Sequence, residues 1–457
     1  MTKLLFLTLL ATCLSCALAR PFNSSLHMRK ARSLGRRANT TPVATAWYPG
    51  WYGSKFPPAQ ISWEKYTQMT FAFALTTPDT SVISLDADSQ KILPDFVTEA
   101  KNHNVSSLLS IGGWTGSQYF SSAVASASNR TIFVKSVVNL ATKYKLDGID
   151  FDWEYPNKQG VGCNLIADDD SANFLSFLQE LRKDPVGSKL ILSAAVSISP
   201  FAGVDGTPMK DVSEFSKVLD HIAIMNYDIW GAFSPTVGPN SPLDDTCSPT
   251  PAGSAVSAIK AWTSAGFPAN QIALGVASYA HTFHVAPSAA INSNGTLALY
   301  PAFDKALQPA GDGETTGMTG VDQCGVATGP SGLFDFSALV SNGFLDKNGT
   351  AASGLIYSFD ECSQTPFLYN KSTQVMVSYD DATSFAAKGK FIKNSGLAGF
   401  AMWHVAGDSN DILVNSINKA IDAAGSTSTT PTNGSPSLTV APTPSSTATT
   451  KQCRRRS

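Results

Sequence analysis

Eight short apolar runs recur along the chain between residues 43 and 424, and helical patterns lie between them. The runs are rich in β-branched and aliphatic residues and fall at 44–48, 69–75, 106–111, 148–153, 190–196, 221–226, 272–278 and 397–403. Most of them are apolar throughout, as parallel strands buried on both faces are. Helical stripes fall at 171–182, 252–265 and 380–394. This alternation predicts an α/β fold, a (β/α)8 TIM barrel of parallel strands surrounded by helices.

The regular spacing is broken once, between the seventh and the eighth run. The segment 283–375 contains glycine turns and short alternating runs, and a structureless loop of such length is uncommon in a compact domain. We therefore expect a small α+β insertion domain between strand 7 and strand 8, within one large domain at 38–424. The Ser-, Thr- and Pro-rich segment 425–457 predicts a disordered linker or an O-glycosylated tail.

The N-terminus has the pattern of a secretory signal. Lys3 precedes an apolar run at 4–18 that ends in small residues, which predicts a signal peptide at 1–19. The basic stretch 20–37 ends in Arg36 and Arg37 and is interpreted as a pro-segment. Several Asn-x-Ser/Thr sites suit a glycosylated secreted protein and occur at Asn23, Asn39, Asn104, Asn129, Asn294, Asn348, Asn370 and Asn433.

The charge of the chain changes when this leader is set aside. Residues 1–37 hold seven basic and no acidic residues, so the rest keeps 26 of 33 basic residues against 35 acidic ones, a net charge of −9. An acidic protein of this kind argues against nucleic acid as a partner. We expect a secreted, extracellular monomer, which could associate with a cell wall but has no membrane partner.

The cysteines indicate disulfide bonds. Cys163, Cys247, Cys324 and Cys362 lie in the large domain, whereas Cys453 lies in the tail. In an oxidising compartment four such cysteines form two disulfides, and the sequence allows three pairings. The pairing that we predict is Cys163–Cys247 with Cys324–Cys362. No CxxC spacing suggests a zinc site.

The most informative stretch is 144–156, which carries four carboxylates in a framework of apolar side chains. Asp150, Asp152 and Glu154 alternate along the predicted strand, so their side chains share one face. Three acids on one face repel one another, so the face must hold a shared proton, a metal ion or a substrate that benefits from negative charge. Asp147 is out of phase with the others and is interpreted as a structural residue at the start of the strand.

Aromatic residues gather where the predicted strands end. In a (β/α)8 barrel, the chemistry lies at the C-terminal ends of the strands. The aromatic residues found there are Trp47, Tyr48, Trp51, Phe71, Phe73, Trp114, Tyr227, Trp230, Tyr279 and Trp403. Because aromatic faces stack on the apolar C–H faces of sugar rings, acids surrounded by aromatic residues favour a carbohydrate substrate.

At these residues the chain resembles family 18 of the glycoside hydrolases, the chitinases, and its leader is similar to that of secreted fungal members. The run from Asp147 to Glu154, Asp-Gly-Ile-Asp-Phe-Asp-Trp-Glu, matches the DGxDxDxE signature of that family. Further matches are the SxGG motif at Ser110, Gly112 and Gly113, the third motif at Met225, Tyr227 and Asp228, and the barrel-closing Trp403.

The resemblance implies a chitinase that retains the anomeric configuration by substrate-assisted catalysis. Glu154 would protonate the glycosidic oxygen and then activate water, and neighbouring carboxylates would raise its pKa. Asp152 would orient the 2-acetamido group and share a proton with Asp150, and Tyr227 would donate its hydroxyl to the acetamido carbonyl. Neither a cofactor nor a metal is expected.

Other residues are expected to bind chitin or chitooligosaccharides. The resemblance implies this role for Tyr48, Phe73, Gly113, Trp114, Tyr155, Met225, Asp228, Tyr279 and Trp403. Ser110 and the two glycines after it are interpreted as structural residues that let backbones approach. One departure is Tyr279-Ala280-His281, where the family often has Tyr-Gly-Arg. His281 and His404 are interpreted as satisfied polar residues.

Three other functions are compatible with parts of this pattern. A lectin-like protein would bind chitin without cleaving it, but such proteins typically lose the acid at the position of Glu154. An endo-β-N-acetylglucosaminidase acting on the chitobiose core of N-glycans would share the carboxylate motif. A metal site would use Asp150, Asp152 and Glu154, yet no histidine ligands accompany them and Mg²⁺ sites usually also hold a phosphate.

Overall fold

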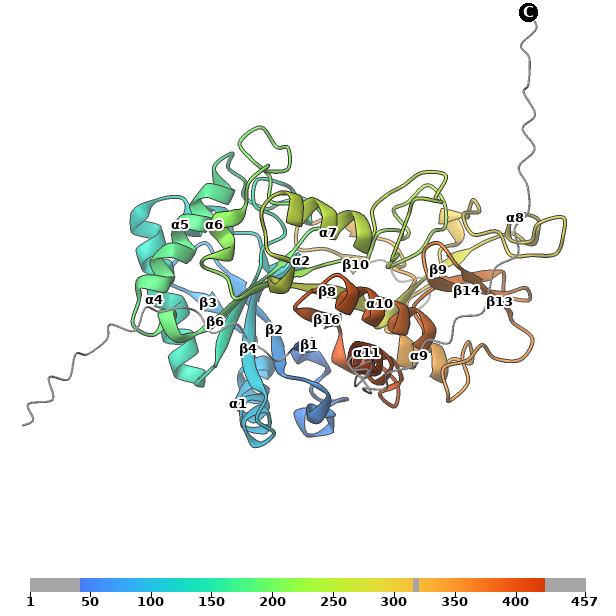
Figure 1. Cartoon of the computed structure of the whole chain (residues 1–457), viewed down its shortest axis with the longest axis horizontal. Coiled ribbons are helices and arrows are strands. Elements are labelled where there is room, and N and C mark those ends of the chain that lie inside the picture. The colour runs from blue at the N-terminus through green and yellow to red at the C-terminus, as the bar shows by residue number, and fades with distance from the viewer. Residues whose placement is uncertain (1–41, 315–319, 424–457) are drawn as a thin grey trace, which may run out of the picture. The chain divides into compact units, whose positions relative to one another are not determined.

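The structure contains the barrel that the apolar runs predict. The computed structural model describes residues 42–314 and 320–423 (Figure 1). Eight parallel strands close on themselves because β1 pairs with β16 on one side and with β2 on the other. In sheet order they are β1 (Val43–Pro49), β16 (Gly399–Trp403), β8 (Ile272–Ala277), β7 (His221–Ile224), β6 (Ile191–Val196), β5 (Gly148–Asp152), β4 (Ser106–Gly112) and β2 (Gln68–Thr76). Each lies within two residues of its predicted run.

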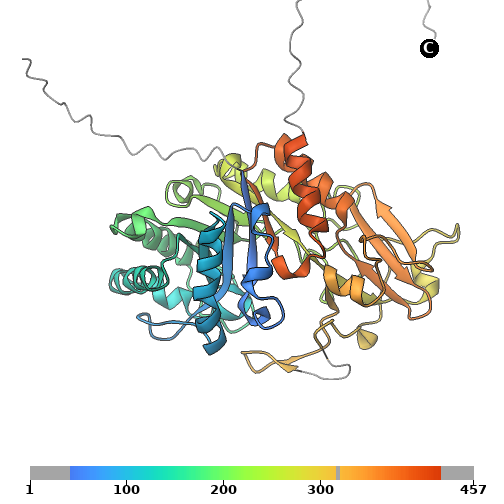
Figure 2. The same ribbon diagram turned by 90° about the horizontal axis from the view of Figure 1, so that it is seen from below.

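Helices cover the outside of the barrel (Figures 1 and 2). The predicted stripe on α5 is buried, since Phe174, Phe177, Leu178 and Leu181 all face the core. Ser254 and Asp381 are N-cap residues that form capping boxes. α7 and α10 each begin at the residue that follows its cap. The helices of the barrel are α1 (Ala87–Asn102), α2 (Gly113–Gly116), α3 (Phe120–Val124), α4 (Ala127–Tyr144), α5 (Asp170–Lys183), α6 (Ser213–Ser216), α7 (Ala255–Ser264), α10 (Ala382–Asn394) and α11 (Ile412–Ala423).

The predicted α+β insertion is present, and it starts earlier than expected. β9 (Tyr279–His284) follows β8 after one residue, so Tyr279 begins the insertion and does not end a barrel strand. The insertion sheet is antiparallel, in the order β12 (Leu333–Asp335), β9, β15 (Val375–Ser378), β14 (Thr365–Asn370) and β13 (Ile356–Asp360). Smaller elements are β3 (Ile83–Ser84), which pairs with β2, the hairpin β10 (Gly320–Val321) and β11 (Ala327–Thr328), α8 (Pro287–Ala290) and α9 (Phe336–Ser341).

The insertion has a small core of its own and is also joined to the barrel. Phe283, Phe367, Tyr369 and Met376 are fully buried in that core. Asp335, at the end of β12, accepts a 3.0 Å hydrogen bond from the hydroxyl of Tyr52 and lies 3.2 Å from Nε2 of His404. His404 thus has a partner at Nε2, whereas its buried Nδ1 has none, so the prediction of a satisfied polar residue holds for one nitrogen only.

Both disulfides join the insertion to loops of the barrel. The bonds are Cys163–Cys324 and Cys247–Cys362, so the pairing predicted from the sequence is wrong. The prediction placed one bond between two loops of the barrel and the other within the insertion. In the folded protein, the loop after β5 reaches the β10–β11 hairpin, and the loop after β7 reaches the turn after β13. Both bonds therefore close long segments of chain.

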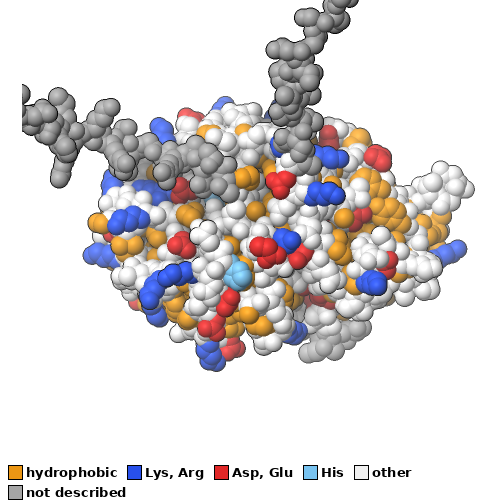
Figure 3. Space-filling view, turned by 60° about the horizontal axis from the view of Figure 1, so that its bottom comes forward, with side chains coloured by type: hydrophobic (Ala, Val, Ile, Leu, Met, Phe, Trp, Pro, Cys, Tyr) orange, Lys and Arg blue, Asp and Glu red, His pale blue; other side chains and the backbone are white. Residues whose placement is uncertain are grey.

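Several predictions fall outside the described residues. These are the signal peptide at 1–19, the pro-segment at 20–37, the tail at 425–457, and the cysteines Cys13, Cys16 and Cys453. In the described ranges, no helix is both long and apolar enough to span a membrane. Acidic and basic side chains are interspersed over the face seen in Figure 3, where they form no continuous basic stripe.

Candidate active site

A cleft of about 1260 Å³ opens at the C-terminal ends of the barrel strands. Its wall is built from the ends of β2, β5 and β16 and from the loops after β4 and β7. This is where (β/α)8 barrels place their chemistry. The predicted residues that line it are Phe73, Trp114, Asp152, Glu154, Tyr155, Met225, Tyr227, Asp228 and Trp403. The fold therefore brings the acids and most of the predicted aromatic residues to one site.

Tyr48 lies elsewhere, and the prediction that it contacts substrate is wrong. Its side chain is fully buried, with its ring 5.6 Å from that of Phe71 and 5.5 Å from that of Phe96 on α1. Its hydroxyl donates to the carbonyl of Phe56. Because side chains alternate along β1, Trp47 points into the barrel and Tyr48 points to the helix layer.

Two more predicted contacts act indirectly. Gly113 is buried with a φ of +77°, and a Cβ there would lie 2.9 Å from the ring of Phe73. A glycine at this position admits that ring to the wall of the cleft. Tyr279 is buried as well, and its hydroxyl donates a 2.7 Å hydrogen bond to Oδ1 of Asp228. Neither residue lines the cleft itself, so both predicted contacts are corrected to supporting roles.

The alternation along β5 explains why the acids face inward. Ile149, Phe151 and Trp153 are buried against the helix layer, where Phe151 contacts Phe174 and Phe177 of α5. The side chains between them point to the barrel interior. Asp147 is bound outside this row, since its Oδ2 accepts hydrogen bonds from the backbone and hydroxyl of Ser107 on β4. The structural role predicted for Asp147 is confirmed.

Asp150 lies below the cleft, in the interior of the barrel. Its Oδ2 accepts hydrogen bonds from Trp47 Nε1 (3.1 Å) and Ser110 Oγ (2.8 Å), and its Oδ1 accepts one from Ser193 Oγ (2.6 Å). Ser110 therefore contacts an acid with its side chain, beyond the backbone role predicted for it. The buried carboxyl of Asp150 is therefore hydrogen-bonded at both oxygens. No pattern in the sequence pointed to Ser193.

Asp152 is buried and incompletely hydrogen-bonded. Its Oδ1 has no hydrogen-bond partner. Burial raises the pKa of Asp152 well above its usual range, and the charges of Glu154 and Asp150 raise it further. Gly112 supports its backbone, because a Cβ there would lie 2.1 Å from the carbonyl oxygen of Asp152. The close approach predicted for this glycine is confirmed.

Glu154 follows the end of β5, and its backbone is bound on both sides. Its N–H donates to Ser117 Oγ at 3.0 Å, and its carbonyl accepts a 2.7 Å hydrogen bond from Asn164 Nδ2. Gly160 packs against the same carbonyl so closely that a Cβ would lie 2.2 Å from the oxygen. The side chain is thus carried into the cleft by a fixed backbone.

The carboxyl of Glu154 is protonated more readily than a free one. Burial raises its pKa to about 7, a hydrogen bond from Tyr155 opposes the rise, and the charge of Asp228 adds to it. The expected direction is right, but its main cause is burial, and the carboxylate that contributes comes from the loop after β7. At neutral pH a large share of Glu154 therefore carries a proton.

Tyr227 and Asp228 face Glu154 from the loop after β7. Burial raises the pKa of Tyr227 well above its usual range, as do the charges of Asp152, Asp228 and Glu154, so its hydroxyl remains a donor. Partial burial opposes ionisation of Asp228, but its hydrogen bonds with His281 and Tyr279 and the charge of His281 lower its pKa. This side of the cleft thus presents a neutral hydroxyl beside a carboxylate.

Aromatic rings form the wall around the acids. Phe73 stacks on Trp403 with ring centroids 5.5 Å apart, and Trp51 stacks on Phe73 at 6.2 Å. Trp114 is 51% exposed at the rim, and Phe233 is 67% exposed in the loop after β7. Trp51 was placed at a strand end but not assigned to the site, and Phe233 was missed because it lies five residues beyond the Asp228 motif.

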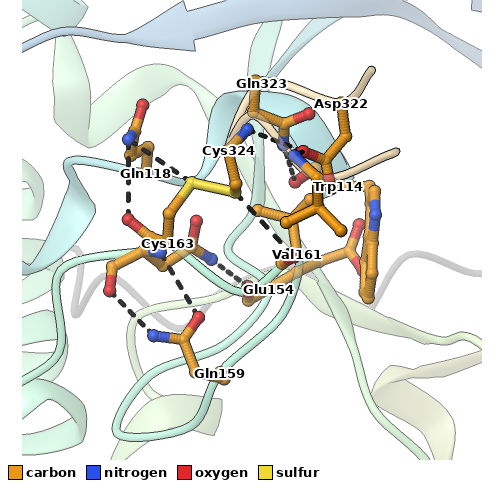
Figure 4. The surroundings of a disulfide bond; sticks show 11 residues. Trp114, Gln118, Glu154, Gln159, Val161, Cys163, Asp322, Gln323 and Cys324 are labelled. Atoms are coloured by element: carbon orange, nitrogen blue, oxygen red, sulfur yellow. Dashed lines mark hydrogen bonds between the residues drawn. A yellow bond between two sulfur atoms is a disulfide. The ribbon is translucent and has the colours of Figure 1, made fainter. Parts of the chain in front are cut away.

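The insertion supplies part of the wall. His281 on β9, Thr328 on β11, Leu333 on β12 and Ser331 in the loop between β11 and β12 line the cleft. Figure 4 shows the Cys163–Cys324 bond between the loop after β5 and the hairpin, with Trp114 beside it. Gln323 Nε2 also lies 3.4 Å from the carbonyl of Trp114. No group of three or more His, Cys, Asp or Glu residues within the described ranges is placed to hold a metal ion.

Comparisons with known proteins find relatives that are named chitinases or chitinase-like. A chitinase-like effector from Moniliophthora perniciosa is 49% identical over 379 residues, which cover 82% of this chain and 86% of that protein. Chitinase A1 from Niallia circulans is 30% identical over 333 residues, covering 71% of this chain and 44% of that protein.

Solved structures that resemble this chain are also chitinases. A chitinase from Rhizomucor miehei has a TM-score of 0.74 and 32% identity, covering 83% of this chain and 100% of that one. A chitinase from Cycas revoluta in complex with (GlcNAc)3 has a TM-score of 0.65 and 25% identity, covering 82% of this chain and 99% of that one. Residues 44–408 match the family model of glycosyl hydrolases family 18. The chain therefore belongs to glycosyl hydrolase family 18.

Proposed function

We propose that this protein is a secreted chitinase that hydrolyses β-1,4 linkages between N-acetylglucosamine units of chitin or chitooligosaccharides, with retention of configuration. One observation carries the proposal: Glu154 lines the cleft with a carboxyl whose pKa is raised to about 7. An acid that keeps its proton near neutral pH can protonate a leaving oxygen. The likeness to chitinases supplies the substrate class.

The first step would be carried out by Glu154 and the substrate together. Glu154 protonates the glycosidic oxygen, while the 2-acetamido oxygen attacks the anomeric carbon and forms an oxazolinium ion. The C–O bond to the leaving sugar breaks, and the proton leaves with that sugar. Glu154, now a carboxylate, removes a proton from water. This water attacks the anomeric carbon from the face that the leaving sugar occupied, and the oxazolinium ring opens. Two displacements at one carbon retain its configuration.

Asp152 and Tyr227 would bind the acetamido group during that attack. The unpaired Oδ1 of Asp152 can accept the acetamido N–H. As positive charge develops on the acetamido group, the carboxyl of Asp152, which would share a proton with Asp150, would stabilise that charge. The hydroxyl of Tyr227 would donate to the acetamido oxygen. The stacked wall of Trp403 and Phe73 would support the apolar face of the sugar.

A binding protein without turnover is the second candidate. Its support is that relatives from two Moniliophthora species, each 49% identical, are named chitinase-like effectors. The cleft and its aromatic wall would suit both functions, whereas a buried, protonated Glu154 is required for only one of them. An endo-β-N-acetylglucosaminidase acting on N-glycan cores is a third possibility, because it would use the same acids on a different chain.

Secretion is part of the proposal. The signal-like pattern at 1–19 and the basic stretch at 20–37 support it. Two disulfides in the described residues support it as well, because disulfides persist in oxidising compartments.

A product time course on chitin hexaose tests the proposal. The wild-type protein is expected to release shorter oligosaccharides whose new ends first appear as the β-anomer, as retention requires. Glu154→Gln is expected to bind the hexaose but to lose hydrolysis by at least about 100-fold. Binding without products from the wild type would favour the second candidate. Cleavage of an N-glycan core in place of the hexaose would favour the third.

A further inference from the structure

Asp228 is held by its backbone and by its side chain. Its N–H donates to Asn240 Oδ1 at 2.8 Å, and Asn240 Nδ2 donates to the carbonyl of Tyr279 at 3.0 Å. Its Oδ1 accepts a hydrogen bond from the Tyr279 hydroxyl and lies 2.7 Å from His281 Nε2. Since Oδ1 has both partners and the side chain is 52% exposed, the other oxygen is left for a ligand in the cleft.

We propose that His281 is a positioning residue that supplies the counter-charge for Asp228 and so keeps this carboxylate ionised and directed into the cleft. The inference deepens the proposed function, because a carboxylate at this place would bind the sugar beside Glu154. An arginine in this place would supply a permanent positive charge. Histidine, unlike arginine, supplies this charge only in its protonated form.

The surroundings of His281 leave Asp228 as the partner of its charge. The imidazole is 7% exposed, and its Nδ1 has no hydrogen-bond partner. Phe233 and Phe283 flank the ring at centroid distances of 6.5 and 6.4 Å, and a Cβ on Gly231 would lie 2.8 Å from its Cε1. Apolar groups cannot stabilise an imidazolium by hydrogen bonding, so the 2.7 Å contact with Asp228 does so.

The charged and titratable groups around this pair come from several elements. Tyr279 lies on the same strand, β9. The loop after β7 contributes Asp228 and Tyr227, and Lys305 binds the carbonyl of Phe233 in that loop at 3.3 Å. The residues paired with His281 on β12 and β15 are Leu333 and Ser378, which are uncharged. Asp335 of β12 is bound by Tyr52 and His404.

The pair also acts on the proposed acid. The charge of His281 lowers the pKa of Asp228, and the charge of Asp228 raises the pKa of Glu154. Loss of the charge on His281 would therefore make Asp228 protonate at higher pH. It would also leave the ionised Asp228 uncompensated, so Glu154 would keep its proton to higher pH. Both limbs of a pH–activity profile would then move in the same direction.

The first test compares His281→Gln with His284→Gln by the pH dependence of kcat/KM on chitin hexaose. His284 lies on the same strand but outside the cleft lining, so it controls for loss of a histidine from β9. His281→Gln is expected to move both limbs to higher pH and to raise KM about tenfold on the acidic side. His284→Gln is expected to keep the wild-type limbs. A uniform loss of activity with unmoved limbs would mean that His281 is merely structural.

The second test needs no substrate. The imidazole resonances of His281, assigned by comparison with His281→Gln, are titrated by NMR in the wild type and in Asp228→Asn. Removal of the negative partner is expected to shift the titration of His281 to lower pH, with no matching shift for His103, which follows the end of α1. An unchanged titration would overturn the inference. A protein that fails to hydrolyse the hexaose but shows the NMR shift would refute only the proposed function.

Discussion

Asn164 donates a 2.7 Å hydrogen bond from its side-chain amide to the backbone carbonyl of Glu154. The next residue toward the N-terminus, Cys163, is joined to Cys324 in the β10–β11 hairpin (Figure 4). The backbone of the proposed acid is thus connected through two neighbouring residues to a hairpin of the insertion. Asn164 is buried, so the carbonyl that it binds has little access to water.

Asn164→Ala is therefore expected to reduce both stability and turnover. Loss of the amide leaves a buried carbonyl unpaired, which costs about 1–3 kcal/mol of unfolding free energy. A less fixed Glu154 backbone should lower kcat more than it raises KM, because alignment with the glycosidic oxygen matters in the transition state. Denaturant unfolding and hexaose kinetics measure the two effects. Leu165→Ala, at a neighbouring side chain that is 46% exposed, is the control and should change neither.

The alkaline limb of activity should report Glu154. The proposed acid is active while it holds its proton, and its pKa is about 7. kcat/KM is therefore expected to be independent of this group below about pH 6 and to fall as pH rises through 7. Initial rates on a soluble chitooligosaccharide across pH 4–9 measure the limb. A limb near the usual pKa of a glutamate would show that burial does not hold the proton on this residue.

Much of the fold follows from local sequence, because each strand and helix carries its own pattern. The eight runs were located within two residues, and capping by Ser254 and Asp381 accounts for the later starts of α7 and α10. The acids were found for the same reason, since Asp150, Asp152 and Glu154 alternate along β5. A pattern that repeats within a few residues can be recognised without information on the tertiary contacts across the barrel.

The features that sequence reasoning missed depend on contacts between distant segments. Cys163 and Cys324 are 161 residues apart, and only the folded loops show that they meet. Tyr48 ends an apolar run like its neighbour Trp47, but the phase of β1 directs it outward. The pKa of Glu154 depends on burial and on Asp228, both of which arise from tertiary packing. His281 gave a signal only as a departure from a family motif.

The same raised pKa predicts a cost to stability. Glu154 has a folded pKa of about 7 against its usual 4.5, so the folded state binds the extra proton between these values. Protonated Glu154 therefore adds to the free energy of unfolding at low pH, and this contribution, about 3 kcal/mol in all, is lost as pH rises through that window. Glu154→Gln removes the ionisation and is expected to be more stable than the wild type at pH 8 but not at pH 4. Equal stability of the two proteins at both pH values would contradict this.

Removal of the Cys163–Cys324 bond should affect long substrates most. The double variant Cys163→Ser/Cys324→Ser frees the β10–β11 hairpin. Thr328 in this hairpin and Leu333, which follows it, line the cleft. KM for the hexaose is expected to rise more than KM for a trimer that reaches fewer residues. The control is Cys247→Ser/Cys362→Ser, which should lower stability without this dependence on chain length. Peptide mapping without reduction checks that the wild type holds both bonds as paired here.

Lys388 on α10 forms an ion pair with Asp380, which lies in the short segment between β15 and α10. Nζ lies 2.5 Å from Oδ1, and both side chains are 0% exposed. Burial lowers the pKa of Lys388 and raises that of Asp380, while the attraction between them opposes both shifts. The pair therefore carries a large cost of desolvation, which is offset only while both partners are present.

Lys388→Met is expected to destabilise the protein by about 3–5 kcal/mol, because Asp380 is left buried without its partner. Adding Asp380→Asn should recover part of that loss, since the uncompensated charge is removed. Denaturant midpoints of the wild type, both single variants and the double variant give the interaction energy as a double-mutant cycle. If the double variant is no more stable than Lys388→Met, the uncompensated charge of Asp380 is not the cause of the loss.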